Sequence, residues 1–165
     1  IWLTSSKNNN IYDGYTEERS SCDVSFFGVC NFYKWNGKDF DYVSTTVETG
    51  DYPDTPENVV DQFLKLNLLY DDCKKSSGVI NRLAEINISN KILNLDKIYE
   101  SDQNIIDDWR SSAQTGCLEF DKKEYDNYVT VTVPVGDDKI IFNLQNKSNK
   151  WQITDIIGNF AMNKN

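Results

Sequence analysis

The chain has 165 residues, of which 39% are hydrophobic and 13% aromatic, enough apolar material for a folded domain and too much for wholesale disorder. Its 17 basic and 26 acidic residues give a formal net charge of −9, which argues against general binding of nucleic acids or anionic membranes. Histidine is absent, which excludes Ser-His-Asp and Cys-His nucleophile pairs, His-containing zinc sites and an imidazole proton shuttle. These exclusions favour binding over catalysis.

The first residues form a small apolar tip, Ile1 to Leu3, followed by a polar run from Thr4 to Asn10. One interpretation is that a signal segment or membrane anchor was removed before this tip, and the alternative is an arbitrary starting point. The residues leave both interpretations open. No stretch approaches the roughly 18 apolar residues of a membrane span, so we expect no stable membrane insertion of the mature chain. Residues 1–21 are predicted to be loop.

Four cysteines form an even set, which allows two disulfides in three possible pairings. We favour Cys22–Cys30, because these residues flank a short apolar stretch, and Cys73–Cys117, which would join the end of a helix to the start of a sheet. No C-x-x-C pair occurs, so the spacing is not that of a zinc site. The alternative is four reduced, buried thiols in a cytosolic protein. Oxidised cysteines would favour an exported protein. Abundant Asn, Lys and Ile with few Arg resemble an AT-rich bacterial coding bias, so the expected location is the bacterial periplasm or envelope.

Residues 22–50 are rich in aromatic and β-branched side chains on both sides of Asn36-Gly37, a pair that signals a hairpin. This pair supplies the positive φ angles that a type I′ turn requires. We therefore expect an N-terminal extension with a β-hairpin over residues 1–52, followed by an α+β domain over 53–165. The two parts are expected to form one structural unit.

Helical signals begin after the hairpin. Thr55 is suited to cap a helix and Pro56 to occupy its first position, and apolar residues then recur at helical spacing from 56 to about 73. Further, shorter helices are predicted after the capping residues Ser77 and Ser89, and over about 103–113.

The apolar period changes to two in the last part of the chain, which predicts strands at 128–135, 140–144 and 151–156. Short turns make them an antiparallel meander. In the last strand, one face is expected to carry Trp151, Ile153 and Asp155, and the other Gln152, Thr154 and Ile156. The predicted fold class is α+β, with a long N-terminal helix plus shorter helices packed on a curved antiparallel sheet, preceded by a β-hairpin extension.

Three segments carry a resemblance to a known family over roughly residues 53–158. They are the helix start Thr-Pro-Glu-Asn-Val-Val-Asp-Gln-Phe-Leu at 55–64, the acidic stretch that ends in Trp at 100–109, and Asn-Lys-Trp-Gln-Ile-Thr-Asp-Ile at 149–156. With them the chain resembles the nuclear-transport-factor-2-like (cystatin-like α+β cone) superfamily. More narrowly, it is similar to small exported bacterial domains of unknown function.

The resemblance implies a cone-shaped sheet wrapped on a long helix, with a concave face that serves ligands, catalysis or partners. Enzymes of the superfamily usually place an Asp–His dyad or similar groups in the cone, and this chain has no histidine. Some relatives are envelope immunity proteins that block a secreted toxin. The resemblance therefore favours a binding role.

Carboxylates occur in neighbouring pairs, at Asp71-Asp72, Asp107-Asp108, Asp137-Asp138, and Glu119 with Asp121. Residues adjacent in sequence point apart on helices and strands, whereas acid/base work needs two carboxylates that face each other about 5–10 Å apart. Calcium-loop and phosphate-loop patterns are also missing from the sequence. No catalytic residue, metal or cofactor is predicted.

The aromatic residues of the hairpin exceed what one sheet face can bury. The simpler interpretation is that most of these aromatic side chains belong to the core. Exposed aromatic surface ringed by acidic residues is also the composition of a protein-binding patch. The partner-binding candidates are Tyr33, Trp35, Asp39, Asp41, Asp71 and Asp72.

The sequence thus predicts a non-enzymatic binding protein, foremost a bacterial immunity or inhibitor protein that occludes the active site of a secreted, type VI-like toxin. The acidic charge favours a basic toxin, because it would steer the encounter. One alternative is an exported envelope protein that binds a small ligand in the cone, and another is a hydrolase that uses carboxylates alone. No nucleic-acid partner is expected, and a homodimer is left open.

Overall fold

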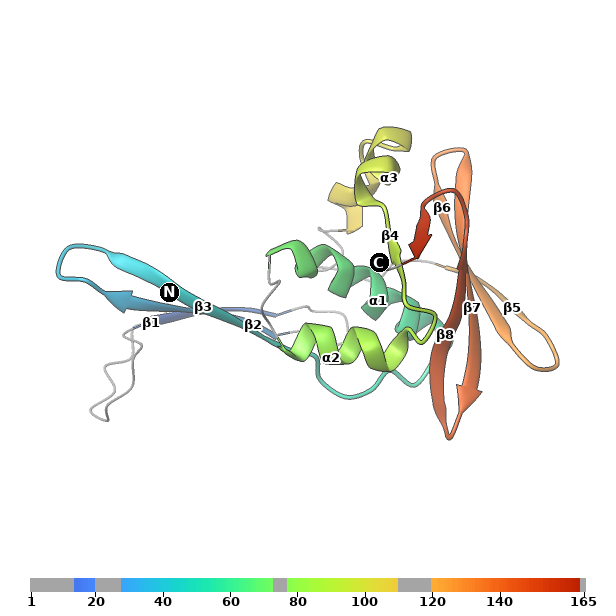
Figure 1. Cartoon of the computed structure of the whole chain (residues 1–165), viewed down its shortest axis with the longest axis horizontal. Coiled ribbons are helices and arrows are strands. Elements are labelled where there is room, and N and C mark those ends of the chain that lie inside the picture. Colours follow the sequence, from blue (N-terminus) through green and yellow to red (C-terminus); the bar gives the residue numbers. More distant parts are fainter. Residues whose placement is uncertain (1–13, 20–27, 73–76, 110–119, 164–165) are drawn as a thin grey trace.

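The computed structural model describes residues 14–19, 28–72, 77–109 and 120–163, and it has an α+β arrangement of helices and antiparallel sheets (Figure 1). A narrow three-stranded sheet, here called the arm, projects from a body that contains the helices and a four-stranded sheet. Within the described ranges, no helix is long and apolar enough to cross a membrane.

The arm consists of β1 (Gly14–Arg19), β2 (Gly28–Trp35) and β3 (Phe40–Glu48), joined antiparallel in the order β1-β2-β3. The predicted hairpin is confirmed by β2 and β3. The prediction of loop over residues 1–21 is wrong for β1. Its sequence, Gly-Tyr-Thr-Glu-Glu-Arg, has no apolar alternation of its own, so its extended state depends on pairing with β2.

The tip of the arm differs from the predicted type I′ turn. Gly37 has a positive φ of 102°, whereas Asn36 is not among the described residues with positive φ. Instead, Asn36 Oδ1 accepts the backbone N–H groups of Lys38 and Asp39, at 2.9 and 2.8 Å. The Asn36 N–H donates to the carbonyl of Asp39 at 3.0 Å. The side-chain amide therefore organises the loop, as Asn does in Asx turns.

Helix α1 (Pro56–Asp72) confirms the helix predicted from residue 56, although it follows the arm and is not N-terminal in the chain. Thr55 caps it, because its Oγ1 accepts the N–H of Asn58 at 3.2 Å. Helix α2 (Ser77–Ile86) confirms the next prediction. Of the segment predicted at about 103–113, the described part is helical at 105–109.

The helix predicted after Ser89 is wrong at its start. The apolar residues there form a short strand, β4 (Lys91–Leu93), which pairs with β9 (Ala161–Asn163) near the end of the chain. Helix α3 (Leu95–Ser101) begins only after Asn94, whose side chain accepts a backbone N–H of its first turn. A short apolar run is compatible with either state, and here the distant partner strand decides it.

The body sheet has the order β5-β6-β7-β8, with every pair antiparallel. Its strands are β5 (Asp121–Glu124), β6 (Val129–Val135), β7 (Asp138–Lys147) and β8 (Lys150–Ile157). The meander β6–β8 was predicted, and β5 was not, because its residues are all charged and exposed.

The core lies between this sheet and the helices (Figure 1). Alternate residues of β6, such as Val131 and Val133, are buried, as the strand pattern predicts. On the helical side Phe63 of α1 meets Phe142 of β7, with ring centroids 5.6 Å apart and the planes at 69°. Such edge-to-face packing fills the space between α1 and the sheet with side chains.

The strict alternation predicted for the last strand is wrong. Ile153 and Ile156 are both fully buried, although they lie on opposite faces in a regular strand. The register explains this, because Asn143 pairs with Asp155 while its neighbour Leu144 pairs with Ile153, so one residue of β8 is extra. A β-bulge therefore switches the face that points to the core.

Several predictions lie outside the described residues. Cys22, Cys73 and Cys117 belong to undescribed segments, and Cys30 lies in β2 with a side chain that is not described. The two disulfides stay predictions, as does the division of the chain at residue 52.

Candidate functional site

Four aromatic side chains share one face of the arm near its tip. In the register of β2 and β3, Tyr33 lies opposite Tyr42, and Trp35 lies opposite Phe40. Because residues two apart in a strand point to the same side, all four side chains lie on one face. We call Tyr33, Trp35, Phe40 and Tyr42 the aromatic face.

The rings of the aromatic face are inclined to one another. Tyr33 and Tyr42 are 6.0 Å apart at 74°, and Trp35 and Phe40 are 5.1 Å apart at 59°. Trp35, Phe40 and Tyr42 remain 46%, 42% and 58% exposed. The three exposed rings therefore present apolar surface to the solvent on one side of the arm.

The opposite face of the arm is charged. Lys34 of β2 lies across from Asp41 of β3, and Asp41 Oδ1 accepts a hydrogen bond from Asn36 Nδ2 at 2.9 Å. Asp39 lies in the tip loop, where its backbone is held by Asn36. Asp41 thus lies on the face opposite the four rings, and Asp39 lies in the loop at the end of the arm. The acidic residues of the tip therefore do not surround the aromatic face as the sequence suggested.

The structure brings only part of the predicted partner-binding set together. Tyr33 and Trp35 lie on the aromatic face, while Asp39 and Asp41 lie close by on the loop and the other face. Asp71 and Asp72 end α1 in the body, well away from the tip (Figure 1), and their side chains lie outside the described residues. Phe40 and Tyr42 were not among the candidates. The expected two-residue turn at Asn36-Gly37 would place Trp35 opposite Lys38, whereas the observed register places it opposite Phe40.

The arm is joined to the body by the guanidinium of Arg82 in α2, in a set of contacts that we call the root clamp. Arg82 Nη1 donates to the carbonyl of Asp51 at 3.0 Å and to Oε1 of Gln62 at 2.9 Å, and Nη2 donates to the carbonyl of Gly50 at 3.0 Å. Gln62 Nε2 in turn donates to the carbonyl of Thr49 at 3.2 Å. Residues 49–51, which follow β3, are thus held to the body through their three successive backbone carbonyls.

Tyr52 completes the root clamp. Its hydroxyl donates to the carbonyl of Trp151 in β8 at 2.6 Å, and its ring lies under the Arg82 guanidinium, 5.4 Å from the centroid. The Lys150 ammonium lies 4.6 Å from the same centroid. Burial raises the pKa of Tyr52 to about 12, and the nearby Glu85 carboxylate adds to this effect while Arg82 opposes it. The hydroxyl therefore stays protonated and continues to donate at physiological pH.

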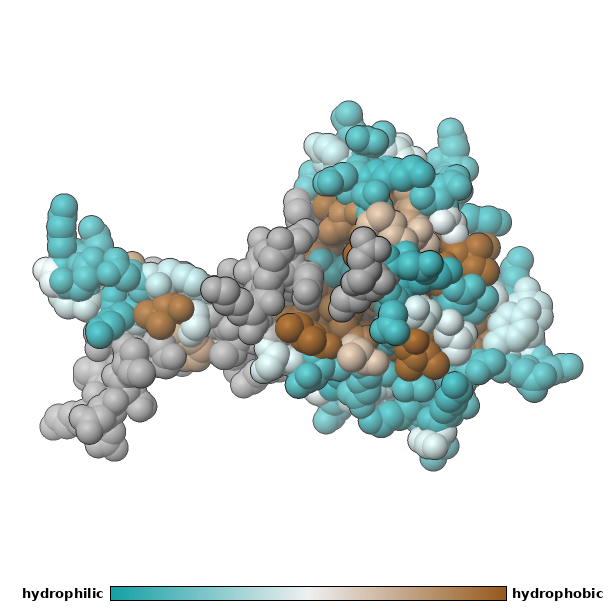
Figure 2. Space-filling view, in the orientation of Figure 1, coloured by the Kyte–Doolittle hydropathy of each residue, from teal (hydrophilic) through white to brown (hydrophobic). Residues whose placement is uncertain are grey.

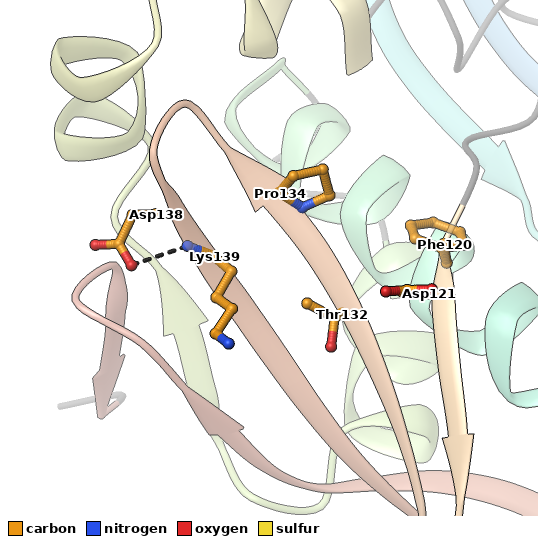
Figure 3. Close-up of a pocket in the computed structure, with 6 residues that line it drawn as sticks. All are labelled: Phe120, Asp121, Thr132, Pro134, Asp138 and Lys139. Carbon is orange, nitrogen blue, oxygen red and sulfur yellow. Dashed lines mark hydrogen bonds between the residues drawn. The ribbon is translucent and has the colours of Figure 1, made fainter.

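A pocket of about 520 Å³ opens on the body sheet (Figure 3). It is lined by Phe120, Asp121, Thr132, Pro134, Asp138 and Lys139. Thr132 and Pro134 alternate with the buried valines of β6, so the pocket lies on the sheet face that points away from the core. The predicted ligand site was the interior of a cone. The structure instead places this pocket outside the layer that Phe63 and Phe142 fill.

Charged groups are buried in α1, which sequence reasoning missed. Lys65 Nζ lies 2.8 Å from Asp61 Oδ2, with the side chains only 1% and 6% exposed. One turn earlier, Glu57 Oε1 binds Lys122 Nζ of β5 at 3.0 Å. The i,i+4 spacing of Asp61 and Lys65 is also that of an ordinary surface pair, so the sequence carries no signal of burial. This pair belongs to the interior of the body and exposes no group for chemistry.

The neighbouring carboxylates do not assemble a reactive site in the described residues. Asp138 Oδ1 accepts the N–H of Lys139 at 2.8 Å, and its Oδ2 accepts from Asn159 Nδ2 at 2.7 Å. These hydrogen bonds lower the pKa of Asp138, that of the backbone N–H most. Asp138 thus serves the turn between β6 and β7. Over the described ranges, no three Asp, Glu or Cys residues are grouped to hold a metal ion.

Comparisons with known proteins return no relatives. No family model, no curated protein and no solved structure matches the chain. The case for a function therefore depends on the surfaces of this molecule.

Proposed function

We propose that the protein is a non-enzymatic binding protein whose arm docks on a protein partner. The observation that supports this most is the aromatic face, where Trp35, Phe40 and Tyr42 stay 42–58% exposed at the end of a projecting sheet. Tryptophan and tyrosine dominate the binding energy of protein interfaces. In Figure 2 the described part of the arm shows one small hydrophobic patch among hydrophilic residues, and the body shows several hydrophobic areas among hydrophilic ones.

The partner class that fits best is a secreted bacterial toxin, which makes the protein an immunity or inhibitor protein of the envelope. A projecting hairpin can enter an active-site cleft and exclude substrate without chemistry of its own. The net charge of −9 favours a basic toxin, because opposite charges speed the encounter. The family resemblance expected from the sequence of residues 53–158, to a superfamily that includes immunity proteins, agrees with the same proposal.

The test is neutralisation of the toxin that co-purifies with the protein from its native host. Cells that produce this toxin should survive with the wild-type protein and die with Trp35→Ala combined with Tyr42→Ala. An aromatic side chain that the partner buries contributes about 2 kcal/mol to the binding free energy. For the two substitutions together we expect at least a hundredfold loss of affinity in titration calorimetry.

The matched control is Tyr125→Ala combined with Tyr128→Ala. This pair is 49% and 38% exposed, and its rings stack at 4.6 Å on the β5–β6 turn. The control removes exposed aromatic rings from the body and should neutralise like the wild type. Full neutralisation by the arm variant would reject the aromatic face as the binding site. An association rate that does not fall as salt rises would reject electrostatic steering.

A second candidate function is small-ligand binding, favoured by the pocket on the body sheet. Its volume of about 520 Å³ lies within the usual range of ligand sites, and Phe120 and Pro134 offer apolar walls beside the charged ends of Asp121 and Lys139 (Figure 3). Native mass spectrometry of the protein from its host should then show a bound small molecule. Thr132→Trp, which fills the pocket, should release it.

A further inference from the structure

Near the tip, the outer edge of β3 is protected less than the two edges of the body sheet. Edge strands of soluble proteins are usually short, charged, bulged or covered, because a free edge invites another strand. β5 has only four residues, all charged, and β8 is bridged in parallel through Asn87 and Ile153. By contrast, β3 has nine residues, none of them Lys, Arg or Pro. Its register with β2 shifts at Val43, and the strand also contacts α2, so the regular open part is the segment next to the tip, Phe40–Tyr42. In the described part of the chain it has β2 on one side and no strand on the other.

The register determines which backbone groups face this edge. The Asn36 N–H donates to the Asp39 carbonyl, which makes Asn36 and Asp39 a hydrogen-bonded pair. Hydrogen-bonded and non-hydrogen-bonded pairs alternate along an antiparallel ladder. The next pair, Trp35 with Phe40, is therefore non-hydrogen-bonded, and Asp41 turns its backbone groups inward to β2. Phe40 therefore points its N–H and C=O away from β2.

We propose that β3 binds its partner by strand addition, accepting an extended segment of the toxin along its outer edge. This inference rests on the proposed function and specifies how the partner is recognised. The backbone of Phe40 supplies a donor and an acceptor in the plane of the sheet. Its side chain, 42% exposed, supplies an apolar neighbour on the aromatic face.

The side chains beside that edge define the chemistry of the incoming strand. Residues directly across a strand pair lie about 4.5–5.5 Å apart at Cβ and interact by type. Phe40 and Tyr42 favour aliphatic or aromatic side chains on the face that they share. Asp41, exposed on the other face, favours Lys or Arg between them. The partner segment is thus an extended one in which apolar and basic residues alternate, which agrees with a basic partner for a chain of charge −9.

Two variants at Phe40 separate backbone pairing from loss of the ring. Phe40→Thr removes the ring and keeps the N–H, whereas Phe40→Pro removes both. Proline is tolerated in an edge strand when its missing N–H faces outward, so the hairpin should survive in both variants. Urea unfolding of each variant checks this. The probe is an acetylated and amidated peptide in which Val and Lys alternate, added to the full chain.

We expect the Pro variant to bind the probe about tenfold more weakly than the Thr variant, the effect of about one hydrogen bond. In the wild type, NMR should show that the probe slows exchange of the Phe40 amide and leaves the Asp41 amide unchanged. Equal affinity of the two variants, or protection of Asp41 in place of Phe40, would overturn strand addition. Neither result affects the proposed function, which is decided by neutralisation with the Trp35 and Tyr42 variant.

Discussion

The arm and the body treat the same kind of residue in opposite ways. In the body, Phe142 and Trp109 are fully buried between helices and sheet, and the edge of β8 is bridged by Asn87. In the arm, Trp35 and Tyr42 remain about half exposed, and within the described ranges no strand pairs with the outer edge of β3. A chain that can bury its large rings in one region and exposes them in another gains less stability from the exposed ones. The difference agrees with the proposal that the arm serves binding and the body stability.

The comparison is tested most directly by removing one ring from each region. Phe142→Ala deletes a fully buried ring and should lower the free energy of unfolding by about 3–5 kcal/mol. Trp35→Ala, which loses one cross-strand neighbour, should cost about 1 kcal/mol or less. Urea unfolding measures both changes. Similar losses for the two variants would show that the arm is part of the stabilising core.

The buried charges of the body predict the next largest effect. Lys65→Met leaves Asp61 buried without its ammonium and should cost about 3 kcal/mol. Replacing both partners, with Asp61→Leu added, should restore most of this loss, because an apolar pair of similar volume needs no desolvation of charges. Thermal unfolding of the single and double variants gives the comparison. A double variant less stable than the single one would contradict this interpretation.

The root clamp joins the two regions, and Arg82→Lys should loosen it. Lysine keeps the charge but lacks the planar fork that reaches the carbonyls of Gly50 and Asp51 together. We expect a loss of about 2 kcal/mol and faster amide exchange at 49–52, with the core amides of β6 unchanged. Uniform acceleration of exchange across the body would show that Arg82 supports the whole fold instead of the junction.

The smallest effect is expected at alkaline pH, through Tyr52. Its folded-state pKa is about 12, above the value of 10.0 that applies to the unfolded chain. The fold therefore favours the protonated hydroxyl. This contribution is complete below pH 10 and is lost as pH rises from 10 to 12. Tyr52→Phe should unfold in less urea than the wild type at neutral pH, with a difference that shrinks over this range. A constant difference would contradict the raised pKa.

The sequence predicted best those elements whose own residues determine them. Val129 to Val135 alternate with polar residues and form β6, and Thr55-Pro56 starts α1. The predictions that are wrong depend on residues far away in the chain. Ile92 joins a strand because Met162 lies opposite, and Gly14–Arg19 is extended because β2 lies beside it.

The candidate site residues show the same limit: local composition identified them, and contacts distant in the sequence did not. Aromatic content around Asn36-Gly37 pointed to the arm, and the composition was enough to name Tyr33 and Trp35. Composition did not separate the two faces, because this requires the register that places Asp41 behind the rings. Lys65 was invisible for a related reason: a helix exposes its charges unless neighbours surround it, and those neighbours come from elsewhere in the chain.

The root clamp has a consequence for how this protein can change. Arg82 holds the carbonyls of Gly50 and Asp51, and backbone carbonyls are present whatever side chains the neighbouring strands carry. The direction of the arm is therefore independent of the residues at its tip. Under the proposed function, substitutions at Trp35 or Tyr42 would change what the tip binds and leave the direction of the arm unchanged. New specificities would then be open to selection, or to a designer who grafts another hairpin onto the same base.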